Sequence, residues 1–90
     1  MVALQEVTVP GCRECIEFEE LWETIKGDFP NVELKQYDAT SPEGQAMVQK
    51  YEIMAAPGIV INGELFSTGG VDKKKLMEKL QALGGYRTPY

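Results

Sequence analysis

The sequence has no histidine and only two cysteines, so few of its side chains are typical ligands of a transition metal. A structural zinc site takes four ligands, drawn mainly from cysteine, histidine and carboxylate side chains. One chain of this composition can hardly supply such a set. Metal or cluster binding therefore stays open only as a site that two chains share.

The sequence also lacks any apolar run long enough to cross a bilayer. The N-terminal segment MVALQEVTV has no basic start, no continuous apolar core and no small-residue cleavage site, which a secretory signal would show. We therefore expect no membrane partner and a cytoplasmic location.

Basic residues are scarce: nine Lys and Arg stand against 14 Asp and Glu, giving a net charge of −5. Nucleic-acid binding requires clustered Lys and Arg. The one basic run, Lys73 to Lys75, lies where a helix is expected to begin, and we interpret it as an exposed helix face. We expect no nucleic-acid partner. The length predicts one domain, residues 1–85, with a short tail, residues 86–90.

Cys12 and Cys15 lie three residues apart in the stretch VPGCREC. Small secreted domains usually carry several disulfides, which this chain cannot form. A single disulfide that closes a four-residue loop would stabilise the fold by only about 2 kcal/mol. A redox pair therefore explains these cysteines better than a structural crosslink does.

The first half of the chain predicts a strand, a helix and a second strand. Leu4 to Val9 has strand composition and is ended by Pro10-Gly11. A helical period follows from Cys12 to about Gly27, with one apolar face. Residues 32–37 alternate as in a strand at a sheet edge. The apolar face of the helix comprises Cys15, Phe18, Leu21, Trp22 and Ile25.

The second half predicts a helix, a hairpin and a last helix. Either Ser41, followed by Pro42, or Thr40 caps the first of these helices. Strands 59–61 and 64–67 flank Asn62-Gly63, a two-residue hairpin turn. Asp72 caps the last helix, whose buried stripe we expect to comprise Val71, Leu76, Leu80 and Leu83. The order βαβαββα predicts an α/β fold: a four-stranded mixed sheet flanked by three helices.

Three motifs in this order give a resemblance to a known family: VPGCREC at 9–15, AAPG at 55–58 and STGGVD at 67–72. Over roughly residues 1–83 the chain resembles the thioredoxin fold, and most of all its small thioredoxin-like and glutaredoxin-like members. The resemblance implies that Pro57 is cis and lies against the cysteine pair. It also implies that the backbone of Ala56 binds an extended substrate.

The motifs also depart from the family's usual residues. Gly11 stands where thioredoxins usually have Trp, and Arg13 and Glu14 replace the usual residues between the cysteines. Gly69 and Gly70 resemble the glutaredoxin segment that binds glutathione. These signals conflict, so the electron donor stays open between a flavin-dependent thioredoxin reductase and glutathione.

The expected chemistry is thiol–disulfide exchange, in which a thiolate attacks a disulfide. Cys12 lies at a helix N-terminus, where the helix dipole and Arg13 favour its thiolate and Glu14 opposes it. We predict a thiol pKa of about 7. Cys15, on the apolar face, is expected to stay protonated until it attacks Cys12.

Glu6 lies six residues before Cys12, where thioredoxins often have a buried Asp that helps to deprotonate the second cysteine. Glu6 is either such a proton acceptor or a carboxylate on a partly exposed strand face.

We therefore predict an oxidoreductase that reduces protein disulfides and is recycled by a thioredoxin-reductase-type donor. The alternatives are a glutathione-dependent glutaredoxin-like enzyme and a non-catalytic module with a metal or cluster between two chains. We expect no resident cofactor and a monomer.

Overall fold

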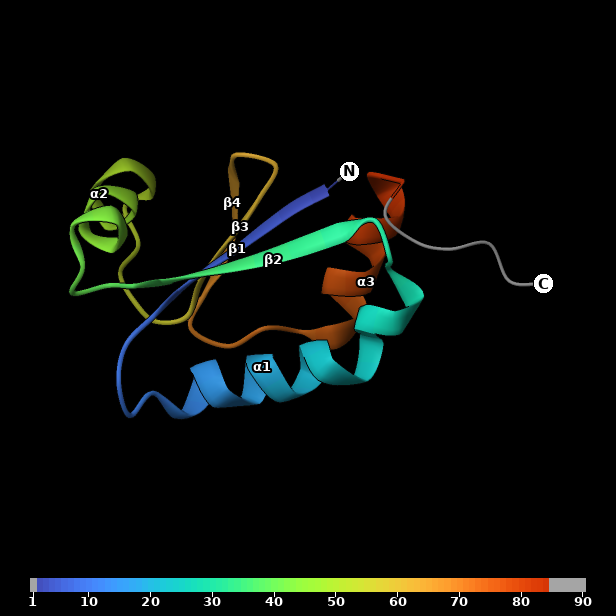
Figure 1. Cartoon of the computed structure of the whole chain (residues 1–90), viewed down its shortest axis with the longest axis horizontal. Helices are drawn as coiled ribbons and strands as arrows, with labels where there is room; N and C mark the ends of the chain where they lie inside the picture. The colour runs from blue at the N-terminus through green and yellow to red at the C-terminus, as the bar shows by residue number, and fades with distance from the viewer. Residues whose placement is uncertain (1, 85–90) are drawn as a thin grey trace.

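The computed structural model describes residues 2–84, so the predicted tail at 86–90 lies outside the described residues. Figure 1 shows strands and helices in the order that the sequence predicts. The elements are β1 (Val2–Thr8), α1 (Arg13–Ile25), a short 3-10 turn (Lys26–Asp28), β2 (Val32–Asp38), α2 (Pro42–Tyr51), β3 (Gly58–Ile61), β4 (Glu64–Thr68) and α3 (Lys73–Ala82).

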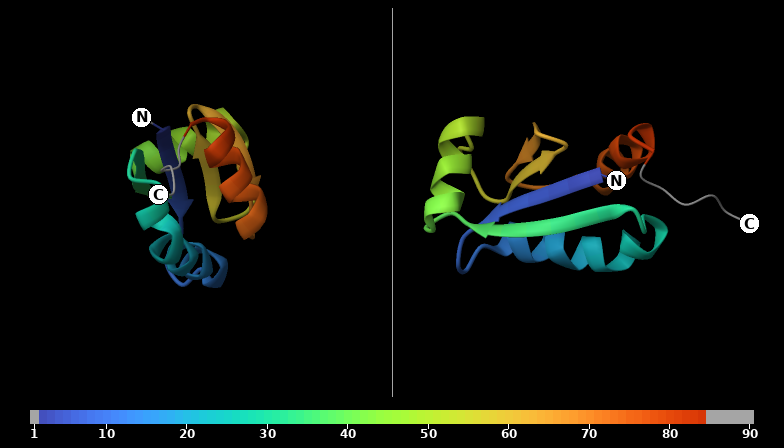
Figure 2. Two further views of the ribbon diagram at one scale, coloured as in Figure 1. Left: turned by 90° about the vertical axis from the view of Figure 1, so that its right-hand side faces the viewer. Right: turned by 45° about the horizontal axis from the view of Figure 1, so that its top comes forward.

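The four strands form one mixed sheet in the order β2-β1-β3-β4. Strand β1 runs parallel to β2 and antiparallel to β3, and β4 pairs antiparallel with β3. Helices α1 and α3 cover one face of the sheet, and α2 lies against the other near the end of β2 (Figure 2). The predicted fold, a four-stranded mixed sheet with three helices, is confirmed.

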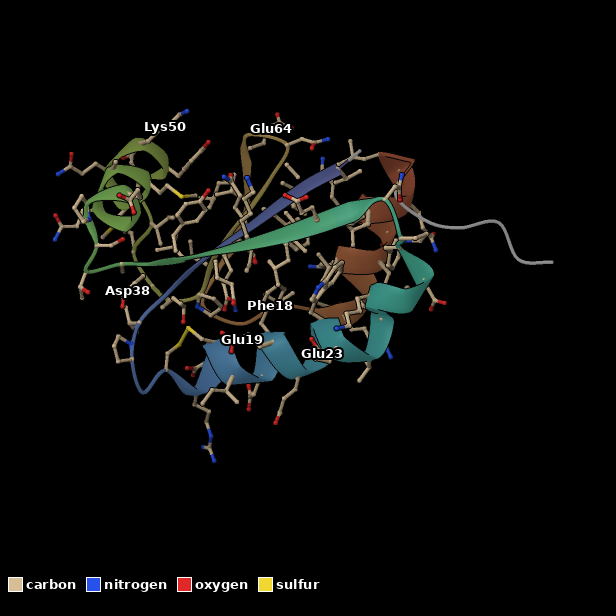
Figure 3. The ribbon with its side chains drawn as sticks, in the orientation of Figure 1. Phe18, Glu19, Glu23, Asp38, Lys50 and Glu64 are labelled. Atoms are coloured by element: carbon tan, nitrogen blue, oxygen red, sulfur yellow. A yellow bond between two sulfur atoms is a disulfide. The ribbon has the colours of Figure 1, made fainter. Side chains whose placement is uncertain are left out.

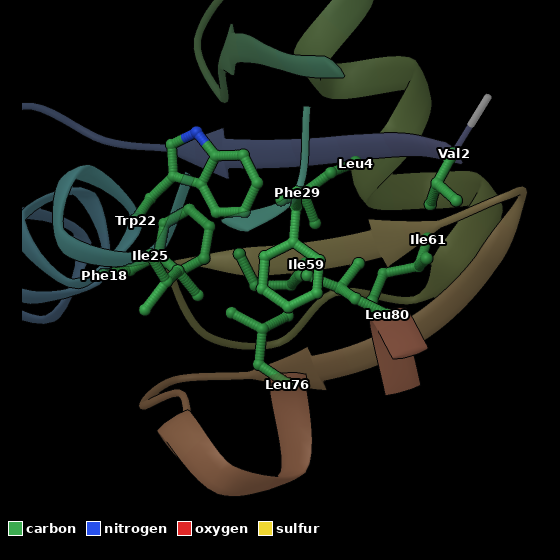
Figure 4. Packing of buried hydrophobic residues seen from close by; sticks show 10 residues of the cluster. All are labelled: Val2, Leu4, Phe18, Trp22, Ile25, Phe29, Ile59, Ile61, Leu76 and Leu80. Atoms are coloured by element: carbon green, nitrogen blue, oxygen red, sulfur yellow. The ribbon is translucent and has the colours of Figure 1, made fainter. Parts of the chain in front are cut away.

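The core lies between the sheet and the pair α1 and α3. Because successive strand residues point to opposite faces, Val2, Leu4 and Glu6 of β1 all face α1. The parallel register sets Glu6 beside Gln36 of β2. Figure 4 shows the apolar part of this layer. Its buried members are Val2, Leu4, Phe18, Trp22, Ile25, Phe29, Ile59, Ile61, Leu76 and Leu80.

The predicted capping residues and hairpin turn are present. Ser41, not Thr40, caps α2: its hydroxyl accepts a hydrogen bond from Gly44 N at 3.0 Å. Asp72 caps α3 in the same way through Lys75 N, also at 3.0 Å. Asn62 and Gly63 have φ of 49° and 82°, the left-handed conformation that a two-residue hairpin needs.

The two outer strands are β2 and β4, and both carry features that break the regularity of an edge. Strand β2 exposes Glu33 and Lys35, whose charged atoms lie 3.8 Å apart. The pairing of β4 with β3 contains a register shift between Ile59 and Val60. The prediction that the second strand lies at an edge is confirmed.

Some predicted boundaries and one predicted core residue were wrong. Strand β1 begins at Val2 rather than Leu4, because β2 extends the ladder to that end through its pairing with Val32. Leu83 is 36% exposed and lies at the C-cap of α3, beyond the last turn that faces the sheet. The buried stripe of α3 therefore ends at Leu80.

No helix within residues 2–84 combines the length and the apolar composition needed to cross a membrane.

Candidate redox site

Cys12 is the N-cap of α1 and is half-buried. Its backbone is extended, with φ of −81° and ψ of 113°, and its Sγ accepts a hydrogen bond from Cys15 N at 3.0 Å. The N–H groups at a helix start have no partner within the helix, and the helix dipole favours negative charge there. The sulfur of Cys12 therefore occupies a position that stabilises a thiolate.

Cys15 lies one turn further along α1, and only 1% of its surface is exposed. It belongs to the buried face of the helix, next to Phe18. Cys12 and Cys15 form a disulfide, and their Cα atoms lie 5.2 Å apart. The pair thus combines one accessible and one shielded sulfur within bonding distance.

A pocket of about 460 Å³ opens beside the disulfide; we call it the cysteine pocket. The loop from β1 to α1 forms one wall, α1 a second and the end of β2 a third. Its lining residues are Thr8, Val9, Pro10, Gly11, Cys12, Cys15, Ile16, Glu19, Gln36, Tyr37 and Asp38. Gly11, with φ of 75°, lets the loop turn into the helix.

Among the buried residues of the described part of the chain, Glu6 is the one charged side chain, and it has no exposed surface. Its Oε1 accepts a hydrogen bond from Gln36 Nε2 at 2.9 Å. Its Oε2 is buried and has no hydrogen-bond partner among the described residues. The structure therefore excludes the partly exposed strand face as the position of Glu6.

Burial raises the pKa of the Glu6 carboxyl from 4.5 to about 7. The hydrogen bond from Gln36 opposes this rise. The neighbouring Glu19 adds to it by charge repulsion and by the hydrogen bond that a protonated carboxyl can make to Glu19. Glu6 consequently exchanges its proton near neutral pH, as a general base or acid does.

Arg13 and Glu14, the predicted residues between the two cysteines, lie outside the cysteine pocket. Both are exposed in the first turn of α1. Asp38, which was not predicted as a site residue, also lines the cysteine pocket, and hydrogen bonds from Thr40 Oγ1 and N lower its pKa. Arg13 and Glu14 can thus act on Cys12 only through their charge.

The Ala56–Pro57 peptide bond is cis, as the resemblance implies. Pro57 is buried, and its carbonyl accepts a hydrogen bond from Gly69 N at 3.1 Å. The structure thus brings the predicted Pro57 and Gly69 together, whereas Gly70 is exposed.

A second, smaller pocket of about 170 Å³ lies beside Ala56; we call it the proline pocket. It is apolar, and its rim includes Met54, which is 90% exposed. Val9 lines both pockets, so the two lie on either side of one residue of the loop before Cys12.

Glu19 and Gln36 were not predicted as site residues. Glu19 is four residues after Cys15, the spacing that stacks two side chains on one helix face. Gln36 pairs with Glu6 in the parallel register. The spacing of Glu19 was visible in the sequence, but its significance depends on the burial of Glu6, which only the packing of α1 on the sheet establishes.

Within residues 2–84 no group of three or more His, Cys, Asp or Glu side chains could hold a metal ion. The site instead combines a disulfide at the start of a helix, the buried carboxyl of Glu6 with a pKa of about 7, and two adjacent pockets. Such a set can carry out thiol–disulfide exchange, in which a thiolate attacks and a proton is moved.

Comparison with protein families gives a match to the model described as "Thioredoxin domain", over residues 5–82. A protein named thioredoxin from Methanocaldococcus jannaschii is 31% identical over 81 residues, which cover 89% of this chain and 93% of that relative.

Solved structures show the same fold. Thioredoxin O2 from Arabidopsis thaliana, in its oxidized state, has a TM-score of 0.73 at 18% identity, covering 97% of this chain and 76% of that one. A mutant thioredoxin from Halobacterium salinarum has a TM-score of 0.72 at 22% identity, covering 98% of this chain and 78% of that one.

Proposed function

The chain belongs to the thioredoxin family, and on this premise we propose that it reduces protein disulfides and is recycled by a thioredoxin-reductase-type donor. One observation carries the proposal: a half-buried Cys12 caps α1 and is bonded to a Cys15 that is 1% exposed. This asymmetry supports different roles for the two sulfurs. Cys12 meets the substrate, and Cys15 completes the exchange.

In the first step the Cys12 thiolate attacks a substrate disulfide, and one substrate sulfur leaves as a thiolate. The N-terminus of α1 stabilises the attacking charge, and Arg13 adds to it. Glu14, in the same turn, opposes it. The product is a mixed disulfide between Cys12 and the substrate.

In the second step Cys15 attacks Cys12 and releases the reduced substrate. Cys15 is buried, so its thiol keeps its proton until a base removes it. Glu6 is the candidate base, since its carboxyl is buried on the face of the sheet that α1 covers and its pKa is about 7. The Cys12–Cys15 disulfide that remains must be reduced by the donor.

The substrate is proposed to lie across Gly11, Ala56 and Pro57, next to Cys12. The apolar proline pocket beside Ala56 suits an uncharged side chain of an extended peptide. The hydrogen bond from Gly69 to Pro57 holds the β4–α3 turn, and with it Gly70, at this end of the sheet. Monomeric action in the cytoplasm is part of the same proposal.

The test compares two recycling systems with insulin as the disulfide substrate: NADPH with thioredoxin reductase, and NADPH with glutathione and glutathione reductase. We expect turnover with the first system, falling to background in the Cys12→Ser variant. Cys15→Ser should instead accumulate a mixed disulfide with the substrate.

Turnover with only the glutathione system would replace this proposal with the glutaredoxin-like alternative. In that case Cys15→Ser would also retain activity on glutathione mixed disulfides. The 31% identity to a relative named thioredoxin favours the first system.

A further inference from the structure

Glu19 lies near both the disulfide and the buried carboxyl of Glu6, on one side of α1. It lies four residues after Cys15 and lines the cysteine pocket with Cys12, Cys15 and Gln36. Figure 3 shows it on the part of α1 near the disulfide, below β2. Glu19 is half-buried, whereas its neighbour Glu20 is exposed and does not line the pocket.

Glu6 has no direct route to solvent, because none of its surface is exposed. Its Oε1 is engaged by Gln36, which itself lines the cysteine pocket. Its Oε2 lacks a partner, and a buried polar atom left unpaired costs about 1–3 kcal/mol. Protonation converts such an oxygen into a donor, and the Glu19 carboxylate is the acceptor next to it.

Of the side chains that surround Glu6, only that of Glu19 is charged among the described residues. Helix α1 contributes Glu19, β2 contributes the neutral Gln36, and β3 contributes the apolar Ile59. The residues that α3 buries, Leu76 and Leu80, are apolar. Within residues 2–84 neither Lys nor Arg forms an ion pair with Glu6.

We propose that Glu6 and Glu19 act as a carboxyl pair, in which Glu19 accepts the proton that Glu6 removes from Cys15 and passes it to water in the cysteine pocket. This inference rests on the proposed function. Glu19 acts through Glu6 and touches neither sulfur of the substrate.

The Cys15 thiol gives its proton to the Glu6 carboxylate, and the resulting Cys15 sulfur attacks Cys12. The Cys12–Cys15 bond forms while the bond from Cys12 to the substrate sulfur breaks, and that sulfur leaves with the electron pair as a thiolate. Glu6 hands the proton to Glu19, which releases it to solvent, and the thiolate product takes a proton from water.

The experiment uses the reduced protein and dithiobis(nitrobenzoate), an aromatic disulfide whose thiol product is coloured. Attack by Cys12 releases a first equivalent of the thiol, and attack by Cys15 on the mixed disulfide releases a second. The rate of the second phase against pH isolates the step that needs Glu6. It should rise with pH around the pKa of Glu6 in the natural chain.

Glu19→Gln removes the charge that faces Glu6 and the acceptor of its proton. We expect the rising limb of the second phase to shift by about one unit to lower pH, because a neighbouring negative charge holds the Glu6 proton on. The plateau rate should also fall, and the first phase should not change. Glu20→Gln, which removes an exposed charge of the same helix, is the matched control and should leave the limb in place.

The double variant tests whether Glu19 acts through Glu6. In a Glu6→Gln background, Glu19→Gln should have no further effect on the second phase, since interacting residues are non-additive. An unshifted limb in Glu19→Gln, or an equal shift in Glu20→Gln, would overturn the proposal. A persistent effect without Glu6 would also overturn it. Failure of the natural chain to release either equivalent would instead reject the redox function itself.

Discussion

Glu6 is the residue at which folding and the proposed chemistry favour different side chains. A buried carboxylate with one unpaired oxygen is costly, and the cost falls when the group takes up a proton. The core around Glu6 would be more stable with an uncharged side chain. The proposed proton transfer therefore accounts for this buried carboxyl better than packing does.

This conflict predicts how stability depends on pH. The pKa of Glu6 is about 7 in the fold against 4.5 as its ordinary value. As the pH rises, the Glu6 carboxyl therefore loses its proton in the unfolded chain before it does so in the folded chain. The contribution of Glu6 to stability is fully present below about pH 4.5 and is lost as the pH rises to about 7. Glu6→Gln should remove that loss and unfold at higher urea concentration than the natural chain at about pH 8.

The gain in unfolding free energy at that pH should be roughly 2–3 kcal/mol, and little or no gain should appear near pH 4. Urea titrations at several pH values measure it. Glu17→Gln, an exposed change on α1, provides the comparison. Parallel stability profiles for the natural chain and Glu6→Gln would show that the carboxyl titrates normally.

Among the elements, α2 depends most closely on a single small residue. Gly44 is buried in its first turn, and a Cβ there would overlap the backbone carbonyl of Asp38 at the end of β2. The close approach seats the helix directly on the strand that forms one wall of the cysteine pocket.

Gly44→Ala should therefore reverse the usual sign of such a change. Alanine in place of glycine normally stabilises a helix by about 1 kcal/mol. Here we expect a loss of roughly 2–4 kcal/mol, because backbone must move to admit the methyl group.

Gly27→Ala is the control for this change, since nothing lies within 4 Å of a Cβ at that position. It should change the unfolding free energy by less than about 0.5 kcal/mol. Equal effects of the two variants in urea titrations would refute the packing argument.

Local signals predicted the elements well. Ser41-Pro42, Asn62-Gly63 and Asp72 each fix a helix start or a turn through interactions within a few residues. The ends of helices and strands that depend on a neighbouring element were predicted wrongly. Strand β1 is extended by β2, and Leu83 is exposed because α3 has passed the sheet by then.

The candidate site likewise has a part that local sequence determines and a part that depends on contacts between elements. Cys12 and Cys15 lie three residues apart in one segment, so the sequence could indicate a redox pair. The set of Glu6, Glu19 and Gln36 comes from three elements, and it exists only once α1 is laid across β1 and β2. No pattern in one segment could have revealed that Glu6 is buried.

At the scale of the whole molecule, the disulfide contributes little to the fold. The main apolar cluster draws its side chains from the sheet, from α1 and α3, and from Phe29 after the 3-10 turn, and it includes neither cysteine. The bridge closes a loop over a sequence separation of three. Opening it should leave sheet and helices in place, as a redox cycle requires.

Reduction should lower the unfolding free energy by no more than about 2 kcal/mol. Urea titrations with and without dithiothreitol, followed by far-ultraviolet circular dichroism, measure this difference. The Cys12→Ser, Cys15→Ser double variant, which cannot form the bridge, should match the reduced protein. An unfolded reduced state would mean that the bridge is structural after all.

The two outer strands have a consequence for association between molecules. An uncovered strand is a template on which a strand of another copy can pair. Charges of both signs project from β2, at Glu33 and Lys35, and the register shift beside β4 disturbs the flat ladder that such pairing needs. These features therefore protect the sheet against growing into fibrils by edge-to-edge pairing with other copies of the chain.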